Sequence, residues 1–145
     1  MLLASAFYVY MQDVVQHRLV LDTAQVQPPP AGMVLDLERN DGADRRFQYL
    51  AGSVVQADVE GPWLRPSVLI MAPDGQATEF RANLRGRENL AQLPPPERQQ
   101  RMARFEVRVM KRYFPSGEPL KIVLGLTQQG QRIYVDTGNV VAGVP

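Results

Sequence analysis

Residues 67–84 read SVLIMAPDGQATEFRANL, and this stretch decides the fold that the chain is expected to adopt. Residues 67–72 form a continuous apolar run of strand length. Pro73-Asp74-Gly75 is a typical turn sequence. In residues 76–84 alternate side chains would face opposite ways, as they do in a strand. The stretch therefore predicts a β-hairpin.

Further strand patterns lie on both sides of this hairpin. They cover residues 33–38, 46–51, 53–59, 120–126 and 132–136. Asn40-Asp41-Gly42 predicts a hairpin turn after the first of them. Gly52 leaves open whether the second and third are two short strands or one strand with a bulge. The last two predict a closing hairpin, which brings the expected total to about six or seven strands.

One segment, residues 97–114, has the pattern of a helix. Met102, Phe105, Val109 and Tyr113 follow at helical spacing after a proline run, and Pro115 is well placed to end the helix. The alternation around Phe105 would also suit a strand, but the length of the run favours the helix. We therefore expect an α+β fold: an N-terminal apolar helix and a mostly antiparallel β domain with one main helix.

The first twelve residues, MLLASAFYVYMQ, carry no charge. A transmembrane helix needs about 20 apolar residues, so this segment is too short to cross alone. It is interpreted as the end of a membrane span that begins upstream, as a buried helix of the domain, or as a helix on a partner subunit. The tyrosines near its polar end favour the membrane, as in an aromatic belt. The expected anchor residues are Leu2, Leu3, Phe7, Tyr8 and Tyr10.

The proline run QVQPPPAG divides the chain into three parts. Residues 1–24 form the apolar helix or partial anchor with its polar end, residues 25–32 a stiff spacer, and residues 33–145 a single domain. By analogy with single-span proteins, we expect an inner-membrane anchor with the soluble domain on the extracytoplasmic side. A cytoplasmic domain is the alternative.

The composition excludes several classes of site. The chain has no cysteine and one histidine, His17, so it holds no disulfide, thiolate nucleophile or zinc finger. Residues 36–44 are acidic but lack the spacing of a calcium-binding loop. No glycine-rich phosphate loop occurs. We therefore expect no metal and no cofactor, and the net charge of +1 argues against a nucleic-acid partner.

Charge is nevertheless unevenly distributed. Residues 36–79 contain eight acids and four arginines, whereas residues 81–112 contain nine basic residues and three glutamates. Such asymmetry can steer a charged partner or dock one half of the chain on the other. On the expected helix, five arginines would form a basic stripe for an anionic ligand or partner. They are Arg98, Arg101, Arg104, Arg108 and Arg112. Trp63, after a Gly-Pro turn, is a candidate anchor for a partner.

Asp136-Thr137-Gly138, after Ile133, Tyr134 and Val135, resembles the active-site loop of retropepsin-like aspartic proteases. The resemblance implies that Asp136 would share a proton with a second aspartate from another subunit. A turn at the end of the closing hairpin accounts for the same three residues without any chemistry.

The leading functional interpretation is a non-enzymatic accessory or assembly subunit of a membrane-associated complex. It would be tethered by its N-terminal helix and act through protein–protein contacts. A small-molecule or lipid-binding module that uses the basic helix is one alternative. An aspartic-protease-like enzyme that uses Asp136 is the other.

Overall fold

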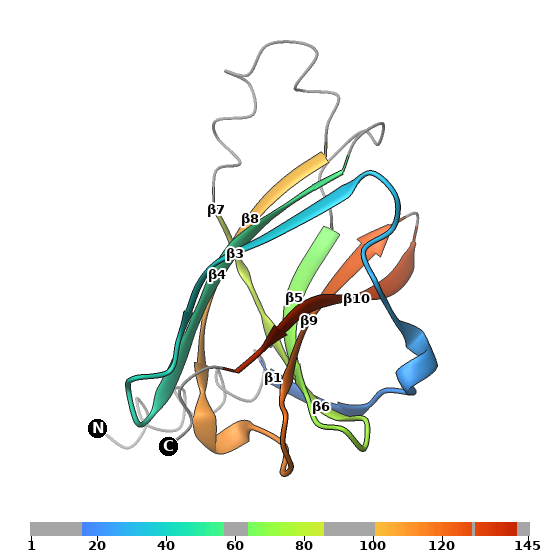
Figure 1. The fold of residues 1–145 in the computed structure, drawn as a ribbon. Helices are drawn as coiled ribbons and strands as arrows, with labels where there is room; N and C mark the ends of the chain where they lie inside the picture. Colours follow the sequence, from blue (N-terminus) through green and yellow to red (C-terminus); the bar gives the residue numbers. More distant parts are fainter. Residues whose placement is uncertain (1–15, 57–63, 86–100, 129, 142–145) are drawn as a thin grey trace, which may run out of the picture.

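The computed structural model describes residues 16–56, 64–85, 101–128 and 130–141, and these residues form two β-sheets (Figure 1). The six-stranded sheet has the order β1 (Gln16–Val20), β6 (Gln76–Arg81), β5 (Leu64–Met71), β9 (Lys121–Gln128), β10 (Gln131–Val140) and β2 (Val26–Gln27). The four-stranded sheet has the order β3 (Met33–Asp41), β4 (Phe47–Gln56), β8 (Arg101–Met110) and β7 (Asn83–Arg85). Among these described strands, β2 and β10 pair in parallel and all other neighbours are antiparallel.

The expected α+β class is wrong, because the part of the chain that the structure describes is all-β. Instead of the main helix over residues 97–114, Arg101–Met110 is strand β8, followed by the short 3-10 turn η3 (Lys111–Tyr113). The physical reason is the alternation of Phe105, Val107 and Val109. All three are buried in the core between the sheets, and β8 pairs with β4 over ten residues.

The strand pairings of the predicted hairpins are confirmed, but β3 continues through Asn40 and Asp41, so the first turn begins at Gly42. β5 pairs with β6 across the Pro73-Asp74-Gly75 turn, β3 pairs with β4, and β9 pairs with β10. Residues 47–56 form one strand that continues through Gly52, and the bulge lies opposite this glycine in β3. The expected N-terminal helix and the turn at Gly61-Pro62 fall outside the described residues.

The main hydrophobic core lies between the two sheets. The largest fully buried side chains within it include Leu50 from β4, Ile70 from β5 and Leu124 from β9. Because one buried cluster contains side chains from both sheets, the two sheets pack face to face as a β-sandwich.

A second cluster covers the other face of the six-stranded sheet. In the run 67–72, Val68 and Ile70 point into the main core, whereas Leu69 and Met71 point into this second cluster. Leu69 is 0% exposed. The continuous apolar run is thus explained by a strand that is buried on both faces. The cluster also contains Leu21, from the connection between β1 and β2.

That connection joins the two edges of the six-stranded sheet. It contains the 3-10 turn η1 (Thr23–Gln25), which Asp22 and Gln25 stabilise with a capping box. In a flat sheet the edges would lie about 24 Å apart, at about 4.8 Å per strand. The chain from Val20 to Val26 reaches about 21 Å even when fully extended. The sheet must therefore curl, and Leu21 packs on the curled face.

A bulge in β3 changes which residues face the core. The register with β4 shifts between Leu37 and Arg39, so Asn40 turns inward where unbroken alternation would place it outside. Asn40 accepts a hydrogen bond from Gln48 at 2.6 Å and donates one to the carbonyl oxygen of Val140 at 2.8 Å. It thereby ties β3 and β4 to the end of β10 in the other sheet.

Candidate interaction surface

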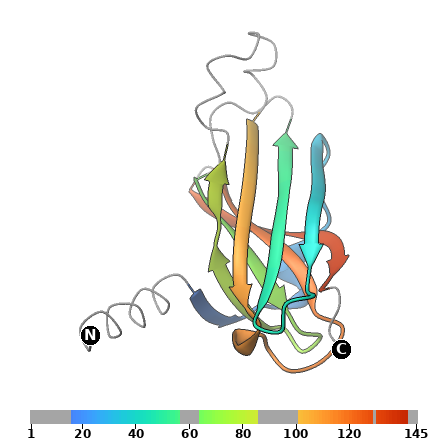
Figure 2. The same ribbon diagram turned by 90° about the vertical axis from the view of Figure 1, so that its left-hand side faces the viewer.

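The outer face of the four-stranded sheet carries arginine, acidic and aromatic side chains on three neighbouring strands. Figure 2 looks onto this face, with β3, β4 and β8 side by side. We call it the arginine–aromatic face. Its residues are Val34, Asp36, Arg39 and Asp41 from β3, Phe47, Tyr49, Ala51, Ser53 and Val55 from β4, and Arg104, Glu106 and Arg108 from β8.

Arginine side chains stack on the aromatic rings of β4. The guanidinium carbon of Arg39 lies 4.6 Å from the centre of the Tyr49 ring, and that of Arg108 lies 4.4 Å from the centre of the Phe47 ring. The centres of the two rings are 6.3 Å apart, and their planes are tilted by 51°. These contacts hold both guanidinium groups against the sheet.

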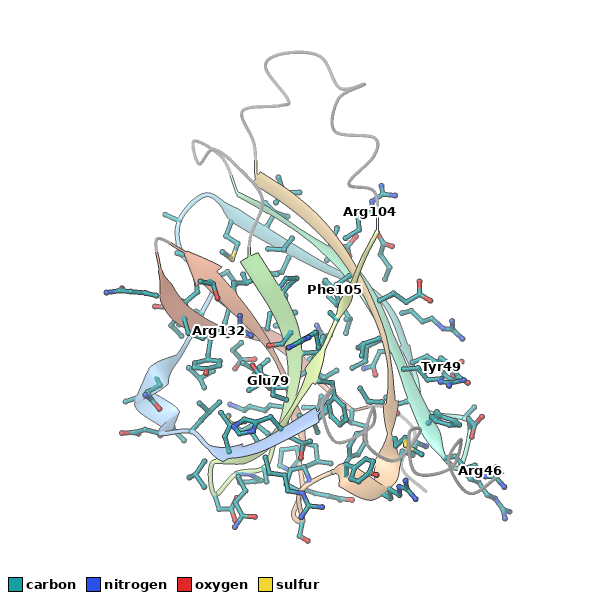
Figure 3. The ribbon with its side chains drawn as sticks, turned by 180° about the vertical axis from the view of Figure 1, so that it is seen from behind. Arg46, Tyr49, Glu79, Arg104, Phe105 and Arg132 are labelled. Carbon is teal, nitrogen blue, oxygen red and sulfur yellow. The ribbon has the colours of Figure 1, made fainter. Side chains whose placement is uncertain are left out.

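Most of the charged groups on this face are solvent-exposed. The side chains of Arg39 and Asp41 form an ion pair at 3.6 Å and are 51% and 47% exposed. Asp36, Arg104 and Arg108 are also exposed. Figure 3 shows Tyr49 and Arg104 projecting from the same side of the molecule, together with Arg46 from the preceding turn. The face therefore presents charged groups around a half-buried aromatic pair.

The structure divides the predicted basic stripe. Arg104 and Arg108 lie on one face of β8, because residues four apart in a strand share a face. Arg112 lies in η3, where its guanidinium stacks on Tyr113. Arg101 begins β8, and Arg98 lies outside the described residues, as do Trp63 and all five predicted anchor residues. The prediction of a basic stripe on a helix is therefore wrong.

Asp136 lies in β10, where the register with β9 shifts between Asp136 and Val140. Its carboxylate accepts a hydrogen bond from the backbone N–H of Gly138 at 2.8 Å and lies 3.6 Å from the Lys121 ammonium group. The Thr137 hydroxyl donates to the carbonyl oxygen of Ile122 at 2.7 Å. The hydrogen bond between Asp136 and Gly138 makes an Asx turn at the bulge, and the contacts with Lys121 and Ile122 join this turn to β9.

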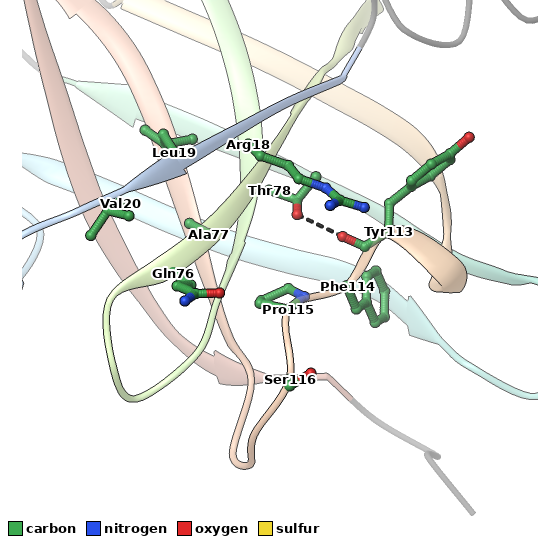
Figure 4. Close-up of a pocket in the computed structure, with 10 residues that line it drawn as sticks. All are labelled: Arg18, Leu19, Val20, Gln76, Ala77, Thr78, Tyr113, Phe114, Pro115 and Ser116. Carbon is green, nitrogen blue, oxygen red and sulfur yellow. Dashed lines mark hydrogen bonds between the residues drawn. The ribbon is translucent and has the colours of Figure 1, made fainter.

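A groove of about 440 Å³ lies elsewhere, between the β1–β6 edge and the segment that follows β8 (Figure 4). Its lining includes Arg18 and Val20 from β1 and Phe114 from the opposite wall. The Thr78 hydroxyl donates to the carbonyl oxygen of Tyr113 at 2.6 Å and joins the two walls. The groove is open to solvent, and among the described residues that line it Arg18 is the one charged side chain.

A polar cluster lies on the outer face of the six-stranded sheet. Arg132 from β10 pairs with Glu79 from β6 at 2.9 Å, and it also donates hydrogen bonds to the hydroxyls of Ser67 and Thr127. Ser67 donates to the same carboxylate at 2.7 Å. The Arg132 and Glu79 side chains are only 26% and 21% exposed. This cluster links four adjacent strands and stabilises the sheet.

The residues that the structure describes contain no helix that is long and apolar enough to span a membrane. They also contain no group of three or more histidine, cysteine, aspartate or glutamate residues that could hold a metal ion. In the comparisons with known proteins, no family model, curated protein or solved structure matches this chain.

The sequence interpretation singled out the arginines of β8 but missed their neighbours on β3 and β4. Phe47, Tyr49 and Ser53 alternate with buried residues of β4, and this alternation was the available signal. For Arg39 and Asp41 the sequence gives no such signal, because the bulge in β3 determines which way they face.

Proposed function

We propose that this chain is a non-enzymatic docking domain, an accessory or assembly subunit of a membrane-associated complex that acts through protein–protein contacts. The arginine–aromatic face is the observation that supports this proposal. Arginine and tyrosine are enriched at the centres of protein interfaces, because each combines a large contact area with directional hydrogen bonds. Here they are already held against a sheet by mutual stacking.

The mixture of charges favours a protein partner over a polyanion. β8 contributes Arg104 and Arg108, whereas β3 contributes Asp36 and Asp41 on the same face. A nucleic acid would meet repulsion along β3. A protein surface can match both signs at once, and electrostatic complementarity of this kind sets specificity and orientation.

The N-terminal residues 1–12 are the proposed anchor to the membrane or to a partner subunit. They carry no charge, and β1 begins at Gln16, only a few residues later. An anchor there would hold the sandwich close to its attachment point. The expected result is that the full chain is recovered in the membrane fraction of lysed cells.

The docking role is tested by placing a photo-crosslinking amino acid at Ser53, in the middle of the arginine–aromatic face. We expect irradiation of cells to yield a covalent adduct with protein, because Ser53 would lie inside the interface. The matched control carries the same group at Glu118, an exposed residue in the connection between η3 and β9, which is not part of this face. A full chain that is soluble and forms no adduct at Ser53 would contradict the proposal.

A further inference from the structure

The charges on the arginine–aromatic face are arranged in rows across the sheet. Each row runs from β3 through β4 to β8 and carries opposite charges at its two ends. The strand register gives the rows as Asp36–Ser53–Arg104, Arg39–Ala51–Glu106 and Asp41–Tyr49–Arg108. The sign alternates from row to row, so β3 reads minus, plus, minus where β8 reads plus, minus, plus.

This arrangement is complementary to itself. If a second copy faces the first about a two-fold axis parallel to β4, the β3 strand of each copy lies over the β8 strand of the other. Asp36 then meets Arg104 of the second copy, and Asp41 meets Arg108 of the second copy. A two-fold axis across the strands would instead place β3 over β3. Through the middle row it brings like charges together, and midway between two rows it matches opposite charges in only those two rows. The axis along β4 matches opposite charges in all three rows and is therefore favoured.

We propose that the protein bound by the arginine–aromatic face is a second copy of this chain, packed face to face about a two-fold axis along β4. This inference rests on the proposed function, since it names the partner of the same surface. The row Asp36–Ser53–Arg104 gives the strongest support for this inference. The side chains of Asp36 and Arg104 are exposed, and among the described residues neither takes part in a hydrogen bond or ion pair. Glu106 already has an interaction within its own chain, so the middle row is not needed for the argument.

The centre of the face is suited to close approach. Ala51 and Ser53 are small, and they lie on β4, where the two sheets would be nearest. Three strands spaced about 4.8 Å apart, over about 25 Å of strand length, cover roughly 400 Å² per copy. This is below the usual size of a stable interface, so the dimer is weak and weakens further as salt screens its charge pairs. A membrane anchor would strengthen it by raising the effective concentration.

The experiment is sedimentation equilibrium of the full chain in a mild detergent over a range of protein and salt concentrations. We expect a monomer–dimer equilibrium that shifts toward monomer as salt increases. Asp36→Arg and Arg104→Asp should each raise the dimer dissociation constant about tenfold or more, because each creates two repulsive contacts per dimer. Arg81→Asp, the matched control on β6 of the other sheet, should leave it unchanged.

Mixing the two variants provides the decisive measurement. In the mixture, the reversed charge at position 36 of one variant faces the reversed charge at position 104 of the other. The unchanged Arg104 of the first variant faces the unchanged Asp36 of the second, so heterodimers should form with nearly wild-type affinity. A misfolded variant would not be rescued in this way.

Three outcomes would count against this arrangement. A monomeric wild-type chain at every concentration, or a dimer that both charge reversals leave intact, overturns the inference. An adduct between Ser53 and a different protein, with a monomeric purified chain, overturns the dimer alone and leaves the proposed function standing.

Discussion

Gly125 allows the Arg132 side chain to lie across the middle of the six-stranded sheet. A Cβ atom at this position would lie 2.5 Å from the Ser67 hydroxyl oxygen and 2.8 Å from Nη2 of Arg132. Gly125 does not have a positive φ, so alanine fits its backbone conformation. The effect of Gly125→Ala is therefore a steric one, and it acts on the polar cluster around Arg132.

The size of the effect follows from the contacts that the guanidinium would lose. Displacing it weakens its ion pair with Glu79 and its hydrogen bond to Ser67. Hydrogen bonds to charged groups contribute about 1.5–3 kcal/mol each, and water partly replaces them at side chains that are about a quarter exposed. Replacing glycine by alanine also stabilises the folded protein by about 0.4–1 kcal/mol, because alanine lowers the conformational entropy of the unfolded chain. We expect a net destabilisation of about 1–2.5 kcal/mol.

The assay is urea unfolding followed by circular dichroism, carried out in two backgrounds. In the wild-type background Gly125→Ala should lower the free energy of unfolding as stated. In the Ser67→Ala/Arg132→Ala background the steric conflict is gone, so the same substitution should be neutral or slightly stabilising. An equal loss of stability in both backgrounds would refute the idea that Gly125 makes room for Arg132.

Two further predictions concern the packing of the sheets. Gly52→Ala should destabilise the domain by about 3 kcal/mol, more than Gly125→Ala does. The Cβ atom of the new alanine would overlap the backbone carbonyl oxygen of Asp36, which cannot rotate away. The midpoint of urea unfolding measures this loss of stability. Leu69→Ala should cost about 2–5 kcal/mol, since Leu69 is 0% exposed in the second cluster. Val34→Ala, at a residue that is 65% exposed, is the control and should change stability by less than about 0.5 kcal/mol in the same assay. Equal effects of Leu69→Ala and Val34→Ala would argue against a buried outer face of the six-stranded sheet.

The hairpins were predictable because their signals are local. The Pro73-Asp74-Gly75 turn and the alternation beside it need no knowledge of distant residues. Strand β8 was missed because residues 102–113 satisfy two periods at once. Phe105 and Val109 are four residues apart, which suits both a helix and a strand, and Val107 between them decides in favour of the strand. β-branched valines at alternate positions were the better guide, and the length of the run was the weaker one.

The arginine–aromatic face could be predicted only in part. The arginines of β8 stood out as a basic group, and the opposite charge of residues 36–79 was visible. What the sequence does not contain is the register. The bulge after Leu37 turns Arg39 and Asp41 outward, and without it Glu38 and Asn40 would occupy those positions on the face. The pairing of acid and base across β4 is thus a property of the folded sheet.

The connection between β1 and β2 also has a practical consequence for how this protein is handled. Composition alone suggests that a soluble fragment should begin after the proline-rich run. Such a fragment would lack Leu21 and leave the backbone of β6 without its neighbour, beside the apolar side chains of Leu69 and Val123. An unprotected strand next to an uncovered apolar surface promotes aggregation. A well-behaved fragment must therefore include Gln16.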